Sequence, residues 1–250
     1  LGCTVTVSRF SPDILLVSGF VGDIAQSPLF LSGRVSVQSE GSALICRVAD
    51  PKPDSLVLDA CAAPGGKTAA LAALMKRGKI LSCELHPHRA ALIENTVKRL
   101  VTPELEVSVV TADSTQFRPE WEEKFDVVLV DAPCSGVGVV GTKPDLLLRL
   151  TAKNLDSLPL LQQSILHNCA RYARPGGALV YSTCTLLRRE NAAVVKEFLS
   201  SCVDFSPDDI TRYLPCGFDP VRAQDGMVQL LPGIDQTDGF FVCRMLKNAR

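Results

Sequence analysis

The stretch that decides the fold runs Leu56-Val57-Leu58-Asp59-Ala60-Cys61-Ala62-Ala63-Pro64-Gly65-Gly66-Lys67-Thr68. It opens as a short apolar run, which is typical of a buried strand, and continues through a Pro-Gly-Gly turn into a helical stretch ending near Arg77. Two adjacent glycines allow a tight turn and a close approach of the backbone to a ligand. A strand, a turn and a helix in this order form the first unit of an alternating α/β sheet.

The alternation of strands and helices continues along the chain after the breaker-rich segment 50–54. We expect further strands at 79–84, 106–110, 125–131, 178–182 and 239–245, and helices at 87–100, 155–172 and 189–201. Pro159 suggests that the second of these helices starts near that residue. The pattern predicts an α/β fold with a doubly wound, mostly parallel sheet over residues 48–250. Polar and apolar residues alternate at 4–7 and 34–37, as in short strands. Residues 1–47 are therefore expected to form a small β-rich N-terminal lead-in.

Size, charge and hydrophobicity exclude several classes of protein. The 250 residues (26.9 kDa) suit one domain with an added lobe, and 46% are hydrophobic, which excludes a disordered chain. The 26 basic and 27 acidic residues give a net charge of −1, so any polyanion must bind at a local basic face. No apolar stretch reaches the length of a membrane span. Because the first residue is Leu1, we expect a fragment or a processed form of a longer protein.

The ten cysteines are widely spaced and form no C-x-x-C pair. We therefore expect free thiols in a reducing, intracellular compartment, most of them packed as small hydrophobic side chains, without a distinction between cytoplasm, nucleolus and mitochondrion. Cys83, His86 and His88 have a spacing that hints at metal, but such histidines at a helix start are typical surface residues. We expect no metal site.

The glycine turn lacks the signatures of nucleotide loops. A phosphate-binding loop needs glycine at the position of Cys61, and G-x-G-x-x-G is absent, so an ordinary strand-helix turn stays open. However, Glu84 ends the second strand, Asp113 follows the third and Asp131 ends the fourth. Carboxylates at successive strand ends share one rim of a parallel sheet, where an acidic residue can accept hydrogen bonds from a ribose diol. A nucleoside-bearing cofactor fits, and a loop that does not cradle phosphates favours S-adenosylmethionine over a nucleotide.

Two cysteine motifs follow the fourth and fifth strands. The fourth strand ends in the motif Asp131-Ala132-Pro133-Cys134-Ser135-Gly136-Val137-Gly138. The fifth strand ends in the motif Tyr181-Ser182-Thr183-Cys184-Thr185. Both place a thiol at the carboxyl edge of the sheet, beside the glycine turn. Burial as a packing residue is the alternative for each. A cation would favour the reactive thiolate, and the candidate cations are Lys67, Arg188 and Arg189.

The glycine turn and the two cysteine motifs together resemble the RNA cytosine-C5 methyltransferases of the Sun/NOL1/NOP2 family. The resemblance covers about residues 33–246 and includes Lys143-Pro144-Asp145, Leu161-Gln162, Glu190-Asn191 and Thr237-Asp238-Gly239-Phe240-Phe241. Two positions depart from the family pattern: Ser39 stands where aspartate is usual, and Ala192 stands where a second acidic residue is common.

The resemblance implies a class I S-adenosylmethionine-dependent methyltransferase sheet, Rossmann-like, with strand order 3-2-1-4-5-7-6. Its activity would be methylation of C5 of cytosine in RNA through covalent catalysis. By resemblance, Cys184 adds to C6, Cys134 assists loss of the C5 proton, a protonated Asp131 stabilises the base near N3, and Lys67 positions the base. The expected cofactor contacts are Cys61, Ala62, Ala63, Pro64, Gly65, Gly66, Lys67, Glu84, Arg89, Asp113 and Asp131.

The expected partner is RNA, with ribosomal RNA ahead of transfer RNA and a loop or single-stranded target. The basic residues at 171, 174, 188 and 189 would form a phosphate-contacting face, unless they are simply solvated. A further domain or a protein partner would supply specificity, and the chain by itself would be monomeric. One alternative is an enzyme acting on DNA or protein, which the second cysteine motif opposes. Another is an RNA-binding ribosome assembly factor with little or no catalysis.

Overall fold

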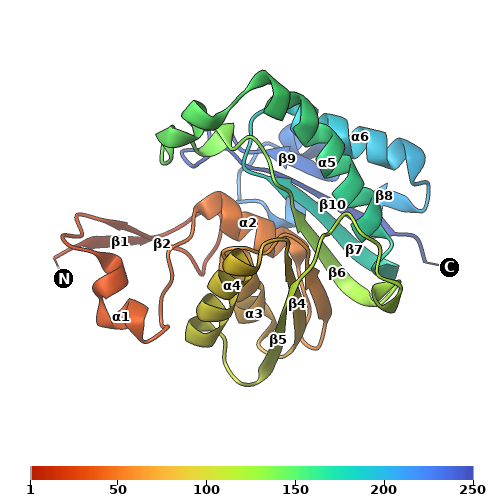
Figure 1. The fold of residues 1–250 in the computed structure, drawn as a ribbon. Helices are drawn as coiled ribbons and strands as arrows, with labels where there is room; N and C mark the ends of the chain where they lie inside the picture. Colours follow the sequence, from red (N-terminus) through yellow and green to blue (C-terminus); the bar gives the residue numbers. More distant parts are fainter. Residues whose placement is uncertain (1, 250) are drawn as a thin grey trace.

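The apolar run before the glycine turn forms β3 (Leu56–Asp59), at the centre of an eight-stranded sheet. The structure, a computed structural model, describes residues 2–249 and shows the sheet with helices on both faces (Figure 1). The other strands of this sheet are β4 (Gly78–Glu84), β5 (Leu105–Thr111), β6 (Phe125–Asp131), β7 (Ala173–Thr183), β8 (Phe205–Pro207), β9 (Met227–Gln229) and β10 (Phe241–Lys247). The helices are α1 (Pro28–Leu31), α2 (Glu40–Ala49), α3 (Gly66–Met75), α4 (Pro87–Leu100), α5 (Ala152–Ala170) and α6 (Ala192–Ser201).

The strand order β5-β4-β3-β6-β7-β10-β8 confirms the expected topology. Strands β3 to β7 pair in parallel, whereas β10 runs antiparallel to β7, β8 and β9. From β3 the chain adds β4 and β5 toward one edge of the sheet and then crosses to β6, on the other side of β3. The strand order therefore reverses between β3 and β6. In open α/β sheets, ligands bind at this switch point, outside the carboxyl ends of the strands. The sheet is thus the doubly wound, mostly parallel sheet of the class I methyltransferase type.

Alternate residues of β6 face two separate cores, which explains its unbroken apolar sequence. Val127 and Leu129 pack in the cluster that includes Leu44 of α2 and Leu71 of α3. Val128 and Val130 pack instead with residues of α5 and α6, among them Leu166, Val195 and Phe198. Figure 1 shows α2, α3 and α4 on one face of the sheet and α5 and α6 on the other. Burial on both faces is the usual reason for such continuous runs in parallel strands.

The N-terminal segment forms an arm beside the sheet (Figure 1). Its antiparallel hairpin consists of β1 (Thr4–Val7) and β2 (Leu15–Ser18), with Thr4 opposite Ser18. The strand expected at 34–37 is wrong, because these residues have no regular secondary structure. The carbonyl of Val35 accepts a 3.0 Å hydrogen bond from the Arg99 guanidinium instead of pairing with a strand. Helix α2 crosses the expected end of the lead-in at residue 47.

Helix α2 begins where the sequence departs from the family pattern. The Ser39 hydroxyl accepts a 3.3 Å hydrogen bond from the Ser42 backbone N–H, and so caps the helix. Serine and aspartate are comparable N-caps, so the departure retains the local function.

Helix α5 starts earlier than Pro159 suggested. It begins at Ala152, where the Thr151 hydroxyl accepts from the Asn154 N–H, and Pro159 lies inside the helix. The Pro-Gly-Gly of residues 175–177 lies within β7, next to a register shift between Phe125 and Val127 of β6. Within residues 2–249, no helix has both the length and the apolar character needed to cross a bilayer.

The glycine turn is held from both sides. Gly65 has φ +101°, and an added Cβ would lie 3.1 Å from Ile93 Cα and 3.1 Å from Thr96 Cβ. Glycine therefore satisfies both the left-handed backbone and the close packing against α4. On the other side, the Thr68 hydroxyl at the start of α3 donates a 2.7 Å hydrogen bond to Asp59 Oδ2 at the end of β3. The turn is fixed at the switch point of the sheet.

Asp59 makes the stability of the protein depend on pH. Burial raises the pKa of Asp59 to about 6, and the Thr68 hydrogen bond only partly offsets this effect. A raised carboxyl pKa in the folded state contributes stability below about pH 4, and this contribution is lost as the pH rises through about 6. Between pH 4 and pH 7 we expect the wild type to lose about 3 kcal/mol of unfolding free energy relative to Asp59→Asn. Urea unfolding of both chains measures this difference, and a pH-independent difference would contradict the assignment.

Candidate active site

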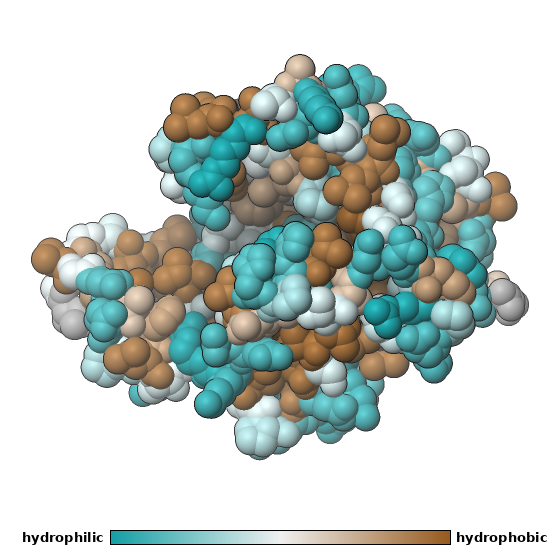
Figure 2. Space-filling model, viewed as in Figure 1, coloured by the Kyte–Doolittle hydropathy of each residue, from teal (hydrophilic) through white to brown (hydrophobic). Residues whose placement is uncertain are grey.

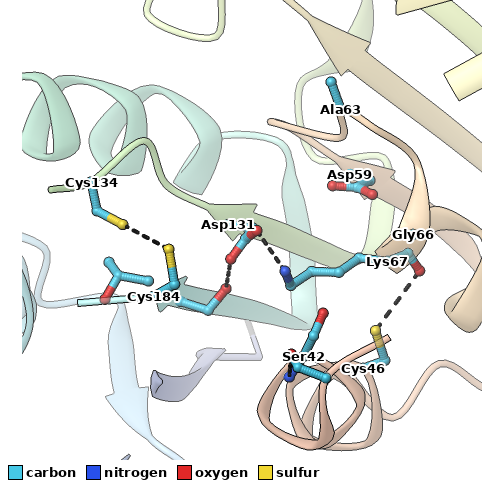
Figure 3. A network of polar contacts seen from close by, with 12 residues as sticks. Ser42, Cys46, Asp59, Ala63, Gly66, Lys67, Asp131, Cys134 and Cys184 are labelled. Atoms are coloured by element: carbon cyan, nitrogen blue, oxygen red, sulfur yellow. Dashed lines mark hydrogen bonds and ion pairs between the residues drawn. The ribbon is translucent and has the colours of Figure 1, made fainter. Parts of the chain in front are cut away.

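The parallel pairing of β6 and β7 brings the two cysteine motifs together. Asp131 at the end of β6 pairs in register with Ser182 near the end of β7, so the loops after both strands leave the sheet side by side. The two sulfurs, Cys134 Sγ and Cys184 Sγ, lie 3.4 Å apart although the residues are 50 apart in sequence (Figure 3). The structure therefore places both predicted thiols in one site at the carboxyl edge of the sheet.

The predicted Lys67 and Asp131 form an ion pair beside the thiols (Figure 3). Lys67 Nζ lies 2.7 Å from Asp131 Oδ2, and the Ser182 hydroxyl donates a 2.8 Å hydrogen bond to Oδ1. Burial alone would lower the pKa of Lys67, but the Asp131 carboxylate outweighs burial and raises it. Both carboxylate oxygens act as acceptors, as in an ionised group. Donation from Asp131 to a base would require a proton on one of these oxygens.

The two thiols have opposite electrostatic character. The hydrogen bond between Cys134 and Cys184 lowers the pKa of Cys184, and the Lys67 cation acts in the same direction, against burial and the Asp131 charge. For Cys134 the same hydrogen bond and its burial raise the pKa well above that of a free cysteine. Because the thiolate is the nucleophilic form, Cys184 is the better nucleophile of the pair. Of the three candidate cations, Lys67 has this effect, whereas Arg189 pairs with Asp156 at 3.1 Å.

A backbone clamp fixes the loop that carries Cys134. The Gly138 N–H donates a 3.0 Å hydrogen bond to the carbonyl of Cys184, and the Gly239 N–H donates a 2.8 Å bond to the carbonyl of Gly138. A Cβ on Gly138 would lie 2.1 Å from the Gly239 oxygen and 2.8 Å from the Cys184 oxygen. The close approach thus needs glycine at residue 138. It ties both cysteine loops to the segment before β10.

The carboxylates expected at the cofactor rim lie at consecutive strand ends. Glu84 Oε1 accepts from the His86 N–H at 3.1 Å and pairs with Arg89 at 3.4 Å. Asp113 Oδ1 accepts from the N–H and the hydroxyl of Thr115 at 2.9 and 2.7 Å. In the described part of the chain, no protein hydrogen bond uses the second oxygen of either carboxylate. Each is therefore oriented by one oxygen while the other can accept from a ligand hydroxyl or amine.

The glycine turn itself presents an open surface to this rim. A Cβ on Gly66 would meet no atom within 4 Å, in contrast to the crowded Gly65. The Ala62 N–H donates to the carbonyl of Cys83, and the peptide bond between Ala63 and Pro64 is cis. Arg89 Nη2 reaches the Ala63 carbonyl at 3.4 Å and so links the turn to Glu84. Of the predicted cofactor residues, Cys61 packs into the core beneath the turn, where burial raises the pKa of its thiol.

Four other cysteines confirm the expectation of small packing residues. Cys46, Cys83, Cys169 and Cys243 are buried, and burial raises the pKa of each thiol. For Cys46 and Cys83 the pKa rises to about 12. These thiols are therefore protonated near neutral pH.

The expected basic face is wrong. Arg171 and Arg174 lie near the start of β7 and pair with Glu122 at 3.0 Å and Asp126 at 2.6 Å, respectively. Arg188 and Arg189 follow the opposite end of β7. The length of the strand separates the two pairs, so they do not share a surface.

Three buried polar side chains around the cysteine loops were quoted in the sequence motifs but assigned no role: Gln162, Glu190 and Asn191. Gln162 shares a buried helix face with Ile165, Leu166 and Cys169. An amide among apolar residues on this face was the sequence feature that could have indicated a buried polar contact. Ser182, which holds Asp131, was also missed, because only strand register shows that it faces the carboxylate.

A depression of about 400 Å³ lies between the arm and the segment before β10. It is lined by Leu16, residues 38–40, Gly233 and residues 236–238. Gln38 donates a 3.4 Å hydrogen bond to the carbonyl of Gly66, and Asp238 precedes the Gly239 of the backbone clamp. Figure 2 shows the surface hollowed beside the arm. The depression therefore adjoins both the glycine turn and the cysteine loops.

Comparisons with known proteins agree with one another. A family model described as 16S rRNA methyltransferase RsmB/F matches residues 46–246. The probable ribosomal RNA small subunit methyltransferase B of Bacillus subtilis is 44% identical over 234 residues, which are 90% of this chain and 51% of that protein. The crystal structure of NSun6 from Pyrococcus horikoshii with SFG is 29% identical with a TM-score of 0.78, over 92% of this chain and 57% of that chain. A methyltransferase homologue from Pyrococcus horikoshii is 27% identical with a TM-score of 0.80, over 98% and 79% of the two chains. This chain spans about half the length of the bacterial relatives that it matches.

The opposite pKa shifts of the two thiols predict selective alkylation. Iodoacetamide should modify Cys184 in preference to Cys134, with a pH midpoint below that of a free cysteine, because the thiolate reacts. Replacing Cys134→Ala removes the donor and should move the Cys184 midpoint to higher pH. Labelling rates from peptide mass spectrometry measure both midpoints, and Cys202→Ala, at the end of α6, is the control. Equal midpoints in wild type and Cys134→Ala would refute the role of the hydrogen bond.

Proposed function

The chain belongs to the RsmB/F family of 16S rRNA methyltransferases, and from this premise we propose that it methylates C5 of a cytosine in ribosomal RNA, with S-adenosylmethionine as the methyl donor. The observation that carries the proposal is the thiol pair with its 3.4 Å separation, beside the Lys67–Asp131 ion pair. Methylation of a base at an exocyclic nitrogen or a ribose oxygen needs no thiol, whereas C5 of cytosine requires a nucleophile at C6.

The rim beside the glycine turn fits the cofactor. The open face over Gly66 gives room for a nucleoside, and Glu84 and Asp113 each have an unused oxygen to accept from its hydroxyl or amine groups. S-adenosylmethionine supplies an electrophilic methyl group on a sulfonium when bound. The residues that would hold it are those of the turn and the rim: Cys61, Ala62, Ala63, Pro64, Gly65, Gly66, Lys67, Glu84, Arg89, Asp113 and Asp131.

Cys184 is the nucleophile in this proposal. Its thiolate forms a bond to C6 of the cytosine, and the electrons of the C5=C6 bond move toward C5 and the ring nitrogen N3. Lys67 and Asp131 lie beside the thiols and face the charge that develops on the ring. Asp131 would have to carry a proton to donate a hydrogen bond to N3, and its oxygens already accept one hydrogen bond each, from Lys67 and Ser182.

Cys134 would assist the second half of the reaction, once C5 has bonded to the methyl group that the sulfonium of the donor gives up, leaving as a neutral thioether. Once Cys184 is bonded to carbon, its sulfur no longer accepts the Cys134 hydrogen bond, and Cys134 can lose its proton to solvent. Its thiolate then takes the proton from C5, the electrons restore the C5=C6 double bond, and the bond between C6 and Cys184 breaks.

RNA would approach through the depression beside the arm. A cytosine must leave its stack to place C6 next to Cys184, which favours a loop or single-stranded target. The chain carries no net excess of positive charge and spans only part of the length of its relatives. We therefore assign specificity for the RNA in part to a further domain or a protein partner.

Replacement of each thiol tests the mechanism. Cys184→Ala should lower methyl transfer on the order of 10³-fold or more, because the addition to C6 is lost. Cys134→Ala should still form the adduct but release it slowly, and so give an RNA-linked protein band of low mobility on a denaturing gel. Cys202→Ala is the matched control and should behave as wild type. Robust turnover by Cys184→Ala, or no adduct with Cys134→Ala, would overturn the assignment.

Bisulfite sequencing tests the substrate. Ribosomal RNA from a deletion strain should lose one or a few 5-methylcytosines, and the wild-type gene should restore them while the Cys184→Ala gene should not. Loss from transfer RNA alone would move the substrate to transfer RNA. A ribosome assembly defect with unchanged methylation, rescued by Cys184→Ala, would replace the proposal with a non-catalytic assembly role.

A further inference from the structure

A buried carboxylate lies between the two cysteine loops. Glu190, in the turn η5 (Arg188–Glu190) after the second cysteine motif, has no solvent exposure. No cation in residues 2–249 forms a salt bridge with it, and its Oε1 atom has no hydrogen-bond partner there. A carboxylate buried in this way is costly, so its presence calls for a reason other than stability.

Glu190 and Gln162 hold the backbone on both sides of Cys134. Glu190 Oε2 accepts a 2.8 Å hydrogen bond from the Ser135 N–H and a 3.1 Å bond from Gln162 Nε2. The same Gln162 amide donates a 2.9 Å bond to the carbonyl of Pro133. The residues before and after Cys134 are thus fixed by one pair of buried side chains.

The next residue in the chain holds the backbone around Cys184 in the same manner. Asn191 Nδ2 donates a 2.9 Å hydrogen bond to the carbonyl of Thr185, and Asn191 Oδ1 accepts from the Thr183 hydroxyl. A 2.7 Å hydrogen bond between the hydroxyls of Ser135 and Thr185 joins the two loops directly. Gln162 and the consecutive residues Glu190 and Asn191 therefore hold both flanks of both thiols.

We propose that Glu190 is a positioning residue that sets the separation of Cys134 and Cys184. Gln162, which donates to Glu190, and Asn191, which holds the Cys184 loop, act together with it. This inference rests on the proposed function and deepens it. The step assigned to Cys134 needs its sulfur within reach of C5, the neighbour of the carbon C6 that is bonded to Cys184. Glu190 contacts neither sulfur and acts through the Ser135 N–H.

The carboxylate suits this role better than an amide. Two N–H donors converge on the single oxygen Oε2, and a charged oxygen forms stronger hydrogen bonds with both than an amide oxygen does. With Glu190→Gln one acceptor oxygen remains, so the Ser135 contact can be retained in part. With Glu190→Ala the Ser135 N–H and the Gln162 amide both lose their acceptor, and the Cys134 loop is free to move away from Cys184.

The first measurement uses the thiols alone, without RNA. Dibromobimane bridges two neighbouring thiols, and peptide mass spectrometry identifies the Cys134–Cys184 product. We expect Glu190→Ala to bridge at least about tenfold more slowly than wild type, with Glu190→Gln in between. Asp126→Ala is the matched control, because Asp126 also accepts a backbone N–H, that of Leu56, but lies at the start of β6. It should lose stability and keep the wild-type bridging rate.

The second measurement uses RNA and the covalent adduct. Glu190→Ala should form the adduct through Cys184 but release it on the order of 10²-fold more slowly, as expected for a misplaced group. A purely structural role would instead lower adduct formation and release together, as in Asp126→Ala. If Glu190→Ala does not fold, Gln162→Met removes the bonds to Pro133 and Glu190 and should give the same pattern.

The outcomes separate the two proposals. Wild-type bridging and release rates in a folded Glu190→Ala chain would overturn the positioning role. If the wild-type chain forms no adduct with any RNA while bridging still depends on Glu190, the positioning role stands and the proposed methylation fails.

Discussion

The parallel register of β6 and β7 is the constraint on which the site depends. It pairs Asp131 with Ser182, so the carboxylate, the hydroxyl that orients it and the two following thiols all emerge at one edge of the sheet. The register is fixed because alternate residues of β6 are buried in two different cores, and a shift by one residue would exchange those faces. The chemistry at the rim therefore depends on the packing of the interior.

The charges around the thiols are balanced by very few groups. Lys67 forms an ion pair with Asp131 and also lowers the pKa of Cys184, so one cation from the glycine turn acts on both groups. The helix that carries Lys67 starts at the switch point of the sheet, where Gly65 permits close packing against α4. A local event in the sequence, a turn with two glycines, thus places the cation of the site beside residues more than 60 positions away.

The sequence allowed prediction of the sheet and most of the candidate site, for identifiable reasons. The strand at 125–131 and the helix at 87–100, which starts with a proline, have a local cause, and both elements form with those bounds. The strand at 34–37 and the helix start at Pro159 were wrong, since Arg99 and the Thr151 cap decide these segments through contacts that the local pattern does not show. The arginines 171, 174, 188 and 189 are neighbours in sequence order but lie at opposite ends of β7, so their charges do not add up to one surface.

The sequence by itself determined the chemical repertoire: two thiols, a lysine and a carboxylate in motifs that follow strands, and the order of the strands through the resemblance of these motifs to one family. Only the tertiary structure decided that the two thiols meet, because the 3.4 Å approach of Cys134 Sγ and Cys184 Sγ allows a hydrogen bond that lowers the pKa of Cys184 and raises that of Cys134. It also decided that Glu190, Gln162 and Asn191 surround these loops. Hydrogen-bond geometry depends on distances between segments that are remote in sequence, and no local pattern of residues encodes those distances.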